Sequence, residues 1–487
     1  MSSECPTGGE VPCRGRQSAR TVVRAVASGF TELEASGREI TPARDSADAP
    51  SADATGADAT GADGPLDWHG YGATRERAAE RTGENESVVC GTGRVGDVEV
   101  VLVSFEFGYL GGSLGARTGA RIAAAYAHAR SHGLPLVSLI ATGGSRMQEG
   151  MVALSQLQRV ARESMLARRA GVPQIAVLRD PSTGGGWATL GASADVVLAL
   201  PGAQVAFAGS RVRPQDADPQ AYSAEGQHAA GHVDQIVEQE ELGDALERWL
   251  TLLTGRSDGP PTPPRALSTG RLSSNPSSGQ EAVARARAAQ RPRAIDYLND
   301  HFEWREEVRG DRCGGVDDGM LCGFGWREGR AVAYAAQAGT ATRPAGFRTA
   351  ARLIRTADRL GIPVLTLIDT PGAANDAEAE SAGAGPAIAE AFAAVAEAAV
   401  PVTSLLIGEG GSGGALALAA PDRLWVTPDS YFSVIAPELA AAILKRPADE
   451  VPATADELWL RPQDVVALGV AQGVVAPHEP RSKTTAA

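Results

Sequence analysis

Two glycine-rich runs are the residues best suited to do chemistry in this sequence. Each follows a short apolar run and stands where a helix is expected to begin. The first backbone amides of a helix lack an intrahelical acceptor and favour negative charge, and glycine leaves them open because it has no Cβ. Both runs therefore predict an oxyanion hole, in which backbone amides stabilise a developing negative oxygen. The candidate catalytic residues are Gly184, Gly185, Gly186, Gly413, Gly414 and Ala415.

A tight strand-to-helix turn of a nucleotide-binding fold would explain a single run equally well. The sequence, however, repeats itself at an offset of 228 residues, because Gly133-Leu-Pro matches Gly361-Ile-Pro and Gly171-Val-Pro matches Ala399-Val-Pro. Two copies of a long repeat indicate a pair of duplicated domains rather than a solenoid. Glycine runs at matching positions of both copies favour two functional sites.

The residues around these runs predict the elements that position them. Short apolar runs bounded by Gly and Pro are typical of buried parallel strands, and the residues between them are helical in period. Alternating strands and helices predict a layered α/β fold with crossover connections. The expected strands cover residues 136–140, 175–178, 364–368 and 402–407, and helices are expected over 187–194 and 415–420.

Longer motifs give each half of the sequence a family resemblance. Residues 111–115 (GGSLG), 142–150 (TGGSRMQEG), 180–185 (DPSTGG) and 207–212 (FAGSRV) resemble the β subunit of bacterial acetyl-CoA carboxylase carboxyltransferase. Residues 310–312 (GDR), 344–348 (PAGFR), 368–373 (IDTPGA) and 408–417 (GEGGSGGALA) resemble its α subunit. The sequence thus resembles a β–α fusion from about residue 65 to about residue 477.

The resemblance implies a fold and an activity. The implied fold is two tandem crotonase-type (ClpP/crotonase-like) domains, the first holding acyl-CoA and the second carboxybiotin, with the active site between the two kinds of domain and often across a dimer interface. The implied reaction is carboxyl transfer from carboxybiotin to a short acyl-CoA such as acetyl-CoA, which gives malonyl-CoA. Because biotin itself then removes the α-proton, Glu149 and Glu409 are expected to orient loops rather than to exchange protons.

The resemblance also implies which residues meet each substrate. The amides of residues 184–186 would hold the thioester oxygen, and those of residues 413–415 the ureido oxygen of biotin. Two arginines four residues apart on one helix are expected to attract the CoA phosphates, and Leu416 and its neighbour to shape the acyl pocket. The expected substrate-binding residues are Gly112, Ser113, Arg117, Arg121, Gly143, Gly144, Arg146, Arg211 and Ala417, and those on the biotin side are Gly372, Phe347 and Arg348.

Biotin is the implied cofactor, presented as carboxybiotin by a separate carrier protein. Lysine occurs only at positions 445 and 483, and neither lies in the Met-Lys-Met setting that biotin attachment sites resemble. The implied partners are a biotin carboxylase, a biotin carboxyl carrier protein and acyl-CoA, within an ATP-dependent complex of fatty acid biosynthesis. This chain itself is expected to form a homo-oligomer.

The sequence departs from the family pattern in two places. Bacterial β subunits usually open with a four-cysteine zinc ribbon, whereas here Cys5 and Cys13 stand alone, so no metal is expected. After residue 373 the α-subunit pattern continues with Pro-Gly and then Arg-Gly-Gln, where this chain has AND over 374–376 and AGA over 382–384. The second departure keeps two alternatives open, a decarboxylase subunit for a malonyl-type CoA thioester and a non-catalytic carboxylase assembly subunit.

Composition agrees with a cytoplasmic enzyme. The 487 residues carry a net charge of −14, which argues against nucleic acid and anionic membrane surfaces as partners. No run approaches the ~20 apolar residues that a membrane span needs. Five scattered cysteines are typical of a reducing compartment.

Shifts in composition along the chain predict its domain boundaries. Residues 1–64 are expected to form a tail, with a low-complexity acidic segment over 46–64 that is expected to be disordered. Pro and Ser predict a linker between the two halves. The expected order after the tail is a first domain over 65–255, the linker over 256–290, a second domain over 291–478 and a tail over 479–487.

Overall fold

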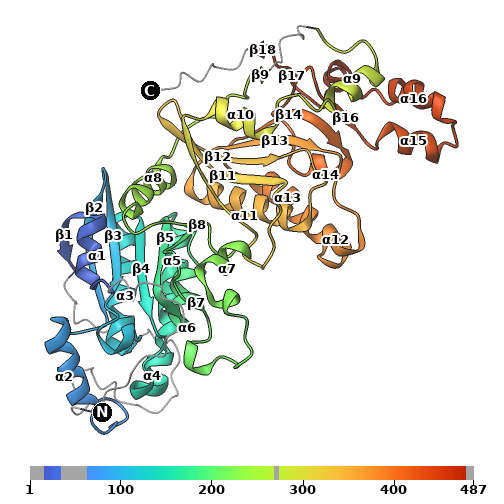
Figure 1. The fold of residues 1–487 in the computed structure, drawn as a ribbon. Helices are drawn as coiled ribbons and strands as arrows, with labels where there is room; N and C mark the ends of the chain where they lie inside the picture. Colours follow the sequence, from blue (N-terminus) through green and yellow to red (C-terminus); the bar gives the residue numbers. More distant parts are fainter. Residues whose placement is uncertain (1–15, 34–62, 268–273, 479–487) are drawn as a thin grey trace, which may run out of the picture.

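The computed structural model describes residues 16–33, 63–267 and 274–478. Two sheets follow one another along the chain and helices pack around them (Figure 1). Both sheets have the same strand order, β1-β2-β3-β4-β5-β6-β8 in the first half and β10-β11-β12-β13-β14-β15-β17 in the second, and each has one further strand paired with its fifth. The predicted duplication of an α/β domain is confirmed.

The first sheet begins with antiparallel strands and is parallel from β3 onward. Its central strand β4 is buried along its whole length, as expected for a parallel strand covered on both faces. The strands are β1 (Ser28–Glu32), β2 (Val88–Val95), β3 (Val98–Phe105), β4 (Leu136–Thr142), β5 (Gln174–Thr183), β6 (Val196–Ala199), β7 (Val205–Ala206) and β8 (Gln235–Ile236). The helices are α1 (Ala19–Val26), α2 (Tyr71–Thr82), α3 (Ala116–His132), α4 (Gly150–Leu154), α5 (Gln156–Arg169), α6 (Gly184–Gly186), α7 (Ala224–Ala229) and α8 (Leu242–Thr254).

The second sheet repeats this arrangement, and its central strand β13 is likewise buried throughout. The strands are β10 (Trp304–Glu307), β11 (Met320–Arg327), β12 (Arg330–Gln337), β13 (Val364–Thr370), β14 (Val402–Gly411), β15 (Leu424–Val426), β16 (Tyr431–Ser433) and β17 (Gly473–Val474), and β9 (Ala266–Leu267) and β18 (Pro477–His478) form a separate pair. The helices are α9 (Gly279–Ala286), α10 (Ala294–His301), α11 (Pro344–Leu360), α12 (Ala377–Ser381), α13 (Ala384–Glu397), α14 (Ser412–Leu416), α15 (Pro437–Ile443), α16 (Val451–Glu457) and α17 (Pro462–Ala467).

The repeated Gly-X-Pro segments end one long helix in each half and lead into the next strand. Gly133 follows α3 with φ 65°, and Gly361 follows α11 with φ 72°. Glycine adopts this left-handed conformation without a Cβ penalty, so it stops the helix. The predicted strands after these segments are confirmed as parts of β4, β5, β13 and β14.

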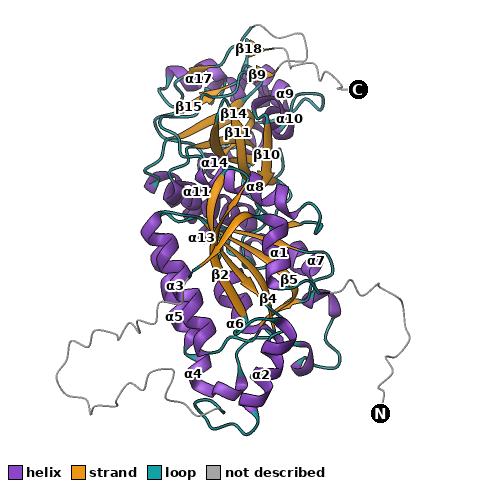
Figure 2. Ribbon diagram, turned by 90° about the vertical axis from the view of Figure 1, so that its left-hand side faces the viewer, coloured by secondary structure: helices purple, strands orange, loops and turns teal. Residues whose placement is uncertain are grey.

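One hydrophobic core runs through both halves. The apolar face of α8 contributes Leu246, Trp249 and Leu253 to a cluster that also holds residues of both sheets. α8 contacts β2 and β3 on one side and β11 and β12 on the other, so it lies between the two halves (Figure 2). Burial of this helix therefore fixes the orientation of one domain against the other.

Buried aspartates of the first half also receive arginines of the second. Asp234 accepts hydrogen bonds from Arg312 at 2.5 Å and from Arg352 at 3.4 Å. A second aspartate, Asp195, pairs with Arg359 at 2.5 Å. Burial would raise the pKa of Asp234, but the two arginines hold it below its usual value. Burial also lowers the pKa of Arg312. The ordinary pKa of arginine is so far above neutral pH that the Arg312 guanidinium stays charged.

Residues 16–33, expected in an N-terminal tail, instead belong to the first domain. α1 buries Val22, Val23 and Val26 in the core, and β1 pairs with β2. These valines share one face of the helix, and this short amphipathic pattern outweighs the polar sequence around it. The low-complexity segment over 46–62 and the expected tail over 479–487 lie outside the described residues.

Part of the expected linker over 256–290 folds with the second domain. β9 pairs with β18, and α9 packs Ala282 and Ala286 in a cluster with Tyr431. The small apolar face of α9 explains this docking. Within the described residues, no helix is long and apolar enough to cross a bilayer.

We predict that Asp234→Asn destabilises the chain by about 3–5 kcal/mol at pH 7, because it leaves Arg312 and Arg352 buried without a counter-charge. The pKa of Asp234 is depressed in the folded chain, so its contribution is present above about pH 4 and is lost as the pH falls through the folded value. Urea unfolding at neutral and acidic pH measures both effects.

The control is Asp376→Asn, which removes the charge of an exposed partner of Arg343 and should shift the unfolding midpoint much less. Equal urea midpoints for the two variants at pH 7 would show that the Asp234 ion pairs stabilise the chain no more than an exposed ion pair does.

Candidate functional site

Both glycine runs follow the same break in strand pairing. In the first half Ile140 pairs with Leu178, but two residues later Thr142 pairs with Ser182. In the second half the pairs are Ile368 with Leu406 and then Thr370 with Gly410. β5 and β14 thus each carry two extra residues, a bulge that bends the strand immediately before the glycines.

The first run forms the first turn of a helix rather than preceding it. Residues 184–186 make up α6, and a single π-type turn follows over Trp187–Gly191 in place of the expected helix over 187–194. Gly184 has φ 63° and donates its amide hydrogen to the Phe207 carbonyl at 3.1 Å. The amides of Gly185 and Gly186 lie in the first turn, where the helix supplies no acceptor.

Packing gives a second reason for these glycines. A Cβ on Gly185 would overlap the Leu157 side chain, and one on Gly186 would overlap the Thr142 methyl group. The turn can therefore sit against α5 and β4 only without side chains. Glycine serves close packing here as well as open amides, which the sequence pattern alone did not indicate.

Two neighbouring loops are brought against this turn. Gly143 donates its amide hydrogen to the Gly111 carbonyl, and Leu114 donates to the Gly144 carbonyl, both at 2.9 Å. A Cβ on Gly184 would lie 3.0 Å from the Cα of Gly144. The structure thus places Gly144 against α6 and joins its loop to the loop over residues 111–114, which carries the predicted Gly112 and Ser113.

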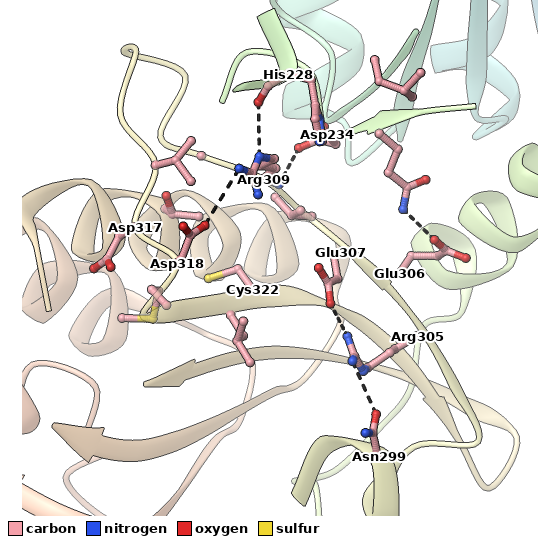
Figure 3. Close-up of a pocket in the computed structure, with 18 residues that line it drawn as sticks. His228, Asp234, Asn299, Arg305, Glu306, Glu307, Arg309, Asp317, Asp318 and Cys322 are labelled. Atoms are coloured by element: carbon pink, nitrogen blue, oxygen red, sulfur yellow. Dashed lines mark hydrogen bonds and ion pairs between the residues drawn. The ribbon is translucent and has the colours of Figure 1, made fainter. Parts of the chain in front are cut away.

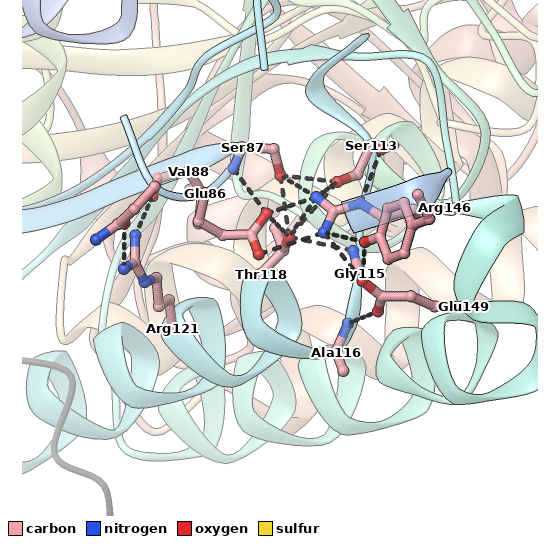
Figure 4. Close-up of polar contacts among 12 residues, drawn as sticks. Glu86, Ser87, Val88, Ser113, Gly115, Ala116, Thr118, Arg121, Arg146 and Glu149 are labelled. Carbon is pink, nitrogen blue, oxygen red and sulfur yellow. Dashed lines mark hydrogen bonds and ion pairs between the residues drawn. The ribbon is translucent and has the colours of Figure 1, made fainter. Parts of the chain in front are cut away.

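Arg146 lies beneath these loops and not at the surface. It is 2% exposed, and its guanidinium pairs with Glu86 at 2.5 Å and with Glu149 at 3.1 Å (Figure 4). It also donates to the Ser113 carbonyl at 2.8 Å. The hydrogen-bonding groups of Arg146 point into the protein, so it can shape the predicted CoA site only through the loops that it joins. It ties the residue 113 loop to the residue 146 loop.

Glu149 orients loops, as the sequence analysis expected. It accepts the amide hydrogen of Ala116 at 2.6 Å, where α3 begins, and the hydroxyl hydrogen of Tyr71 at 2.5 Å. Burial raises the pKa of Tyr71, so its hydroxyl remains a donor. Burial would also raise the pKa of Glu86, but Arg146 holds it below its usual value. Glu86 and Arg146 are therefore a charged pair at neutral pH.

The other arginines predicted to bind substrate differ in whether their guanidinium groups are already hydrogen-bonded within the protein. Arg117 is exposed on α3, and Arg211 is exposed in a short turn over Ser210–Val212. Arg121 donates to the Val88 carbonyl at 3.1 Å and to Asn85 at 2.7 Å. Arg117 and Arg211 are thus free to meet an anionic ligand, whereas Arg121 already holds the neighbouring strand.

The second glycine run also forms the first turn of a helix. α14 covers Ser412–Leu416, shorter and earlier than the expected helix over 415–420. A Cβ on Gly413 would meet nothing within 4 Å, whereas one on Gly414 would overlap the amide of Ala373. Gly413 is therefore the open position of this turn, and Gly414 allows it to pack on the loop after β13.

That loop contains the departure from the family pattern and remains ordered. Thr342 donates its amide hydrogen to the Gly372 carbonyl at 3.1 Å, and Ala374 donates to the Thr342 carbonyl at 2.9 Å. Asp376 caps α12 through the amide of Ala379. The altered residues thus continue into a capped helix, and Gly372 lies against α14.

Two predicted residues of the second half are interior. Phe347 and Ala417 belong to one buried cluster with Ala387 and Ala391, so neither reaches a substrate directly. Ala417, the residue directly after α14, is fully buried, so its side chain is not exposed to an acyl group. Leu416, one residue earlier, is 43% exposed and faces outward.

Two further polar residues of the second half, Arg348 and Glu409, bind other residues of the chain. Arg348 pairs with Asp311 at 2.6 Å and donates to the Ala382 carbonyl at 3.0 Å. Glu409 accepts from Arg287 and from the Tyr431 hydroxyl, both at 2.8 Å, so it orients its loop as expected.

A cavity of about 820 Å³ lies at the seam between the halves and away from both glycine runs (Figure 3). Arg305 in its wall binds Glu307 at 2.6 Å, and Arg309 lies 3.9 Å from Asp318. Because these charged side chains engage one another, the cavity is not the predicted anion site. In the described part of the chain, no cluster of three or more His, Cys, Asp or Glu is placed to hold a metal ion.

Comparison with known proteins agrees with this geometry. Residues 275–485 match the family described as acetyl co-enzyme A carboxylase carboxyltransferase-like. The acetyl-coenzyme A carboxylase carboxyl transferase subunits beta/alpha of Saccharopolyspora erythraea are 37% identical over 433 residues, which cover 84% of this chain and 76% of that protein. A probable biotin-dependent acyl-coenzyme A carboxylase beta3 subunit of Mycobacterium bovis is 32% identical over 415 residues, 82% of each chain.

The fold matches a solved carboxyltransferase structure. The transcarboxylase 12S hexamer with methylmalonyl-coenzyme A and methylmalonic acid bound superposes with a TM-score of 0.71 at 21% identity, over 95% of this chain and 87% of that one. This likeness shows the crotonase-type fold of both halves. Together with the identity to the fused relatives, it shows that the chain belongs to the acetyl-coenzyme A carboxylase carboxyl transferase family and is a carboxyltransferase.

Proposed function

We propose that this carboxyltransferase moves a carboxyl group from carboxybiotin, carried by a separate protein, to a short acyl-CoA such as acetyl-CoA. The observation that carries the proposal is the pair of equivalent bulged strands, each ending in a glycine turn. One turn then stabilises the enolate oxygen of the thioester, and the other the ureido oxygen of biotin. A single hole would serve only one of these oxygens.

The biotin side rests on Gly413. Its outward face is open, so a ligand oxygen can approach the backbone of α14 closely. The acyl-CoA side rests on the amides of Gly185 and Gly186, with Arg117 and Arg211 exposed for the CoA phosphates. This assignment gives each half one substrate.

The acyl group is proposed to be short. Leu416 is the exposed apolar residue of α14 and replaces Ala417 as the candidate wall of the acyl pocket. An apolar wall discriminates by only ~1–3 kcal/mol per methylene, so acetyl and propionyl esters should differ by no more than about 10–200-fold in efficiency.

The two turns of one chain do not face each other. Both views place α6 and α14 in different halves and well apart along the long axis (Figures 1 and 2). Both halves also expose large apolar side chains, which is typical of surfaces that bind protein. They are Met147, Met151, Phe207 and Val212 in the first half, and Leu416, Val434, Leu439 and Ile443 in the second. We therefore propose a homo-oligomer in which the first half of one protomer meets the second half of its partner.

The proposed context follows from the cofactor. The chain would act in the cytoplasm with a biotin carboxylase and a biotin carboxyl carrier protein, and malonyl-CoA would supply fatty acid biosynthesis. The open position at Gly413 favours catalysis over a purely structural role.

Substitution of Gly413 tests the biotin-side hole. Gly413→Val should lower carboxyl transfer by about 10²–10³-fold, because a side chain at this open position blocks the approach of an oxygen to the amides. The matched control is Gly473→Val, where a Cβ also meets nothing within 4 Å but the position lies in β17. Transfer from malonyl-CoA to free biotin is the measurement, with thermal unfolding as a check. Similar activity for the two variants would refute the assignment.

Mixed oligomers test the composite site. We expect Gly185→Val and Gly413→Val to be inactive alone, but to regain about a quarter of wild-type activity when co-expressed in a twofold dimer. Half of the dimers would then be mixed, and each would contain one intact site. Activity of the co-expressed mixture is measured, and mixed dimers isolated with two different tags should show about half of wild-type activity. Inactive mixed dimers would contradict a site shared between protomers.

A further inference from the structure

The strand bulge before each glycine turn is accommodated differently in the two halves. Extra residues in a strand leave a backbone amide without its ladder acceptor, and a buried amide needs another partner. In β14 that residue is Glu409, whose amide donates to the carboxylate of Asp369 at 3.1 Å. The matching residue of β5 is Pro181, which has no amide hydrogen, and the matching residue of β4 is Ala141.

The carboxylate is held in place from the other side by an arginine. Arg291 donates to both oxygens of Asp369, at 2.6 and 2.7 Å, and both side chains are almost fully buried. Arg291 also donates to the Pro292 carbonyl at 3.2 Å and to the Ala286 carbonyl. It therefore connects the end of α9 to the end of β13.

The surrounding backbone is shaped around this pair. A Cβ on Gly408, inside the bulge, would overlap both the Asp369 carboxylate and the Arg291 guanidinium. Glycine at this position is thus required by the ion pair itself. The corresponding position of the first half, Asp180, carries a side chain.

We propose that Asp369 is a positioning residue for the second glycine turn. Its carboxylate supplies the acceptor that the bulge removes at Glu409, and so fixes where the amides of Ser412 and Gly413 lie, three to four residues onward. Arg291 keeps the carboxylate in register with β14. This inference rests on the proposed function of that turn as the biotin-side hole, and it assigns Asp369 no contact with substrate.

The matched control is Asp358, whose carboxylate accepts backbone amide hydrogens at the other end of β14. Its carboxylate accepts the amide hydrogens of Ala399 at 2.7 Å and Val400 at 3.0 Å, just before β14 begins. Asp358→Ala therefore removes a carboxylate-to-amide cap from the same chain segment without touching the bulge.

The kinetic test compares the use of free biotin in transfer from malonyl-CoA with the separately measured binding of acetyl-CoA. Asp369→Ala should lower kcat/KM for free biotin at least tenfold, while the Kd for acetyl-CoA stays within twofold of wild type. Asp358→Ala should lower the unfolding midpoint but change neither constant more than twofold. Equal biotin kinetics in the two variants, or a parallel loss of acetyl-CoA binding in Asp369→Ala, would overturn the proposal.

Amide hydrogen exchange provides a readout that does not depend on activity. The amides over 409–411 should exchange at least tenfold faster in Asp369→Ala than in Asp358→Ala. Unchanged exchange would overturn the positioning role, whereas fast exchange together with an inactive wild type would count against the proposed function alone.

A conservative variant covers the case in which Asp369→Ala does not fold. Asp369→Asn keeps an oxygen that can accept from Glu409 but loses the charge that Arg291 holds. It should raise the KM for free biotin at least threefold with the Kd for acetyl-CoA unchanged. A wild-type KM for biotin in this variant would also overturn the proposal.

Discussion

The two-residue bulge near the end of each central strand pair is the constraint on which the site depends. Without the bulge, β5 and β14 would continue their regular parallel pairing with the neighbouring strands, and every backbone amide would be hydrogen-bonded. The bulge ends that pairing and turns the chain into a helix within a few residues. Amides of the first helical turn are thereby left available at the same place in both halves. The loops that flank each turn can approach it because glycine occupies the contact positions.

Buried ion pairs hold these irregular segments in place. Arg146 with Glu86 and Glu149 ties the loops of the first half, and Asp369 with Arg291 ties those of the second. A buried pair contributes little net stability compared with apolar packing, but its loss leaves an uncompensated charge. Such pairs therefore specify geometry more than they stabilise the fold. The Asp234 pairs extend the same principle to the seam between the domains.

Features close together in the sequence could be predicted from it. The apolar runs gave the central strands, and the glycine runs with their 228-residue offset gave the duplication and the two turns. Contacts between segments that are distant in the sequence could not be predicted from it. Glu86 lies 60 residues from Arg146 and outside every motif, so nothing marked Arg146 as buried. Ala417 and Leu416 are neighbours in sequence, and only the direction of α14 shows which one faces the core.

The boundaries of the first domain were missed for a related reason. Residues 19–26 carry a short valine-rich face whose partners lie on β3 and α8, so burial of this helix depends on the whole domain. Propensity alone does not reveal such docking, because the tertiary contacts decide it. The mutual engagement of the seam arginines and aspartates has the same origin.

The division of labour between the two glycine turns is the central claim. Amide hydrogen exchange of the full chain, with and without a saturating ligand, tests it most directly. Acetyl-CoA should slow exchange at residues 185–187 and leave residues 412–414 unchanged, whereas free biotin should do the reverse. Slowing at residues 412–414 by acetyl-CoA, or at residues 185–187 by biotin, would contradict the account.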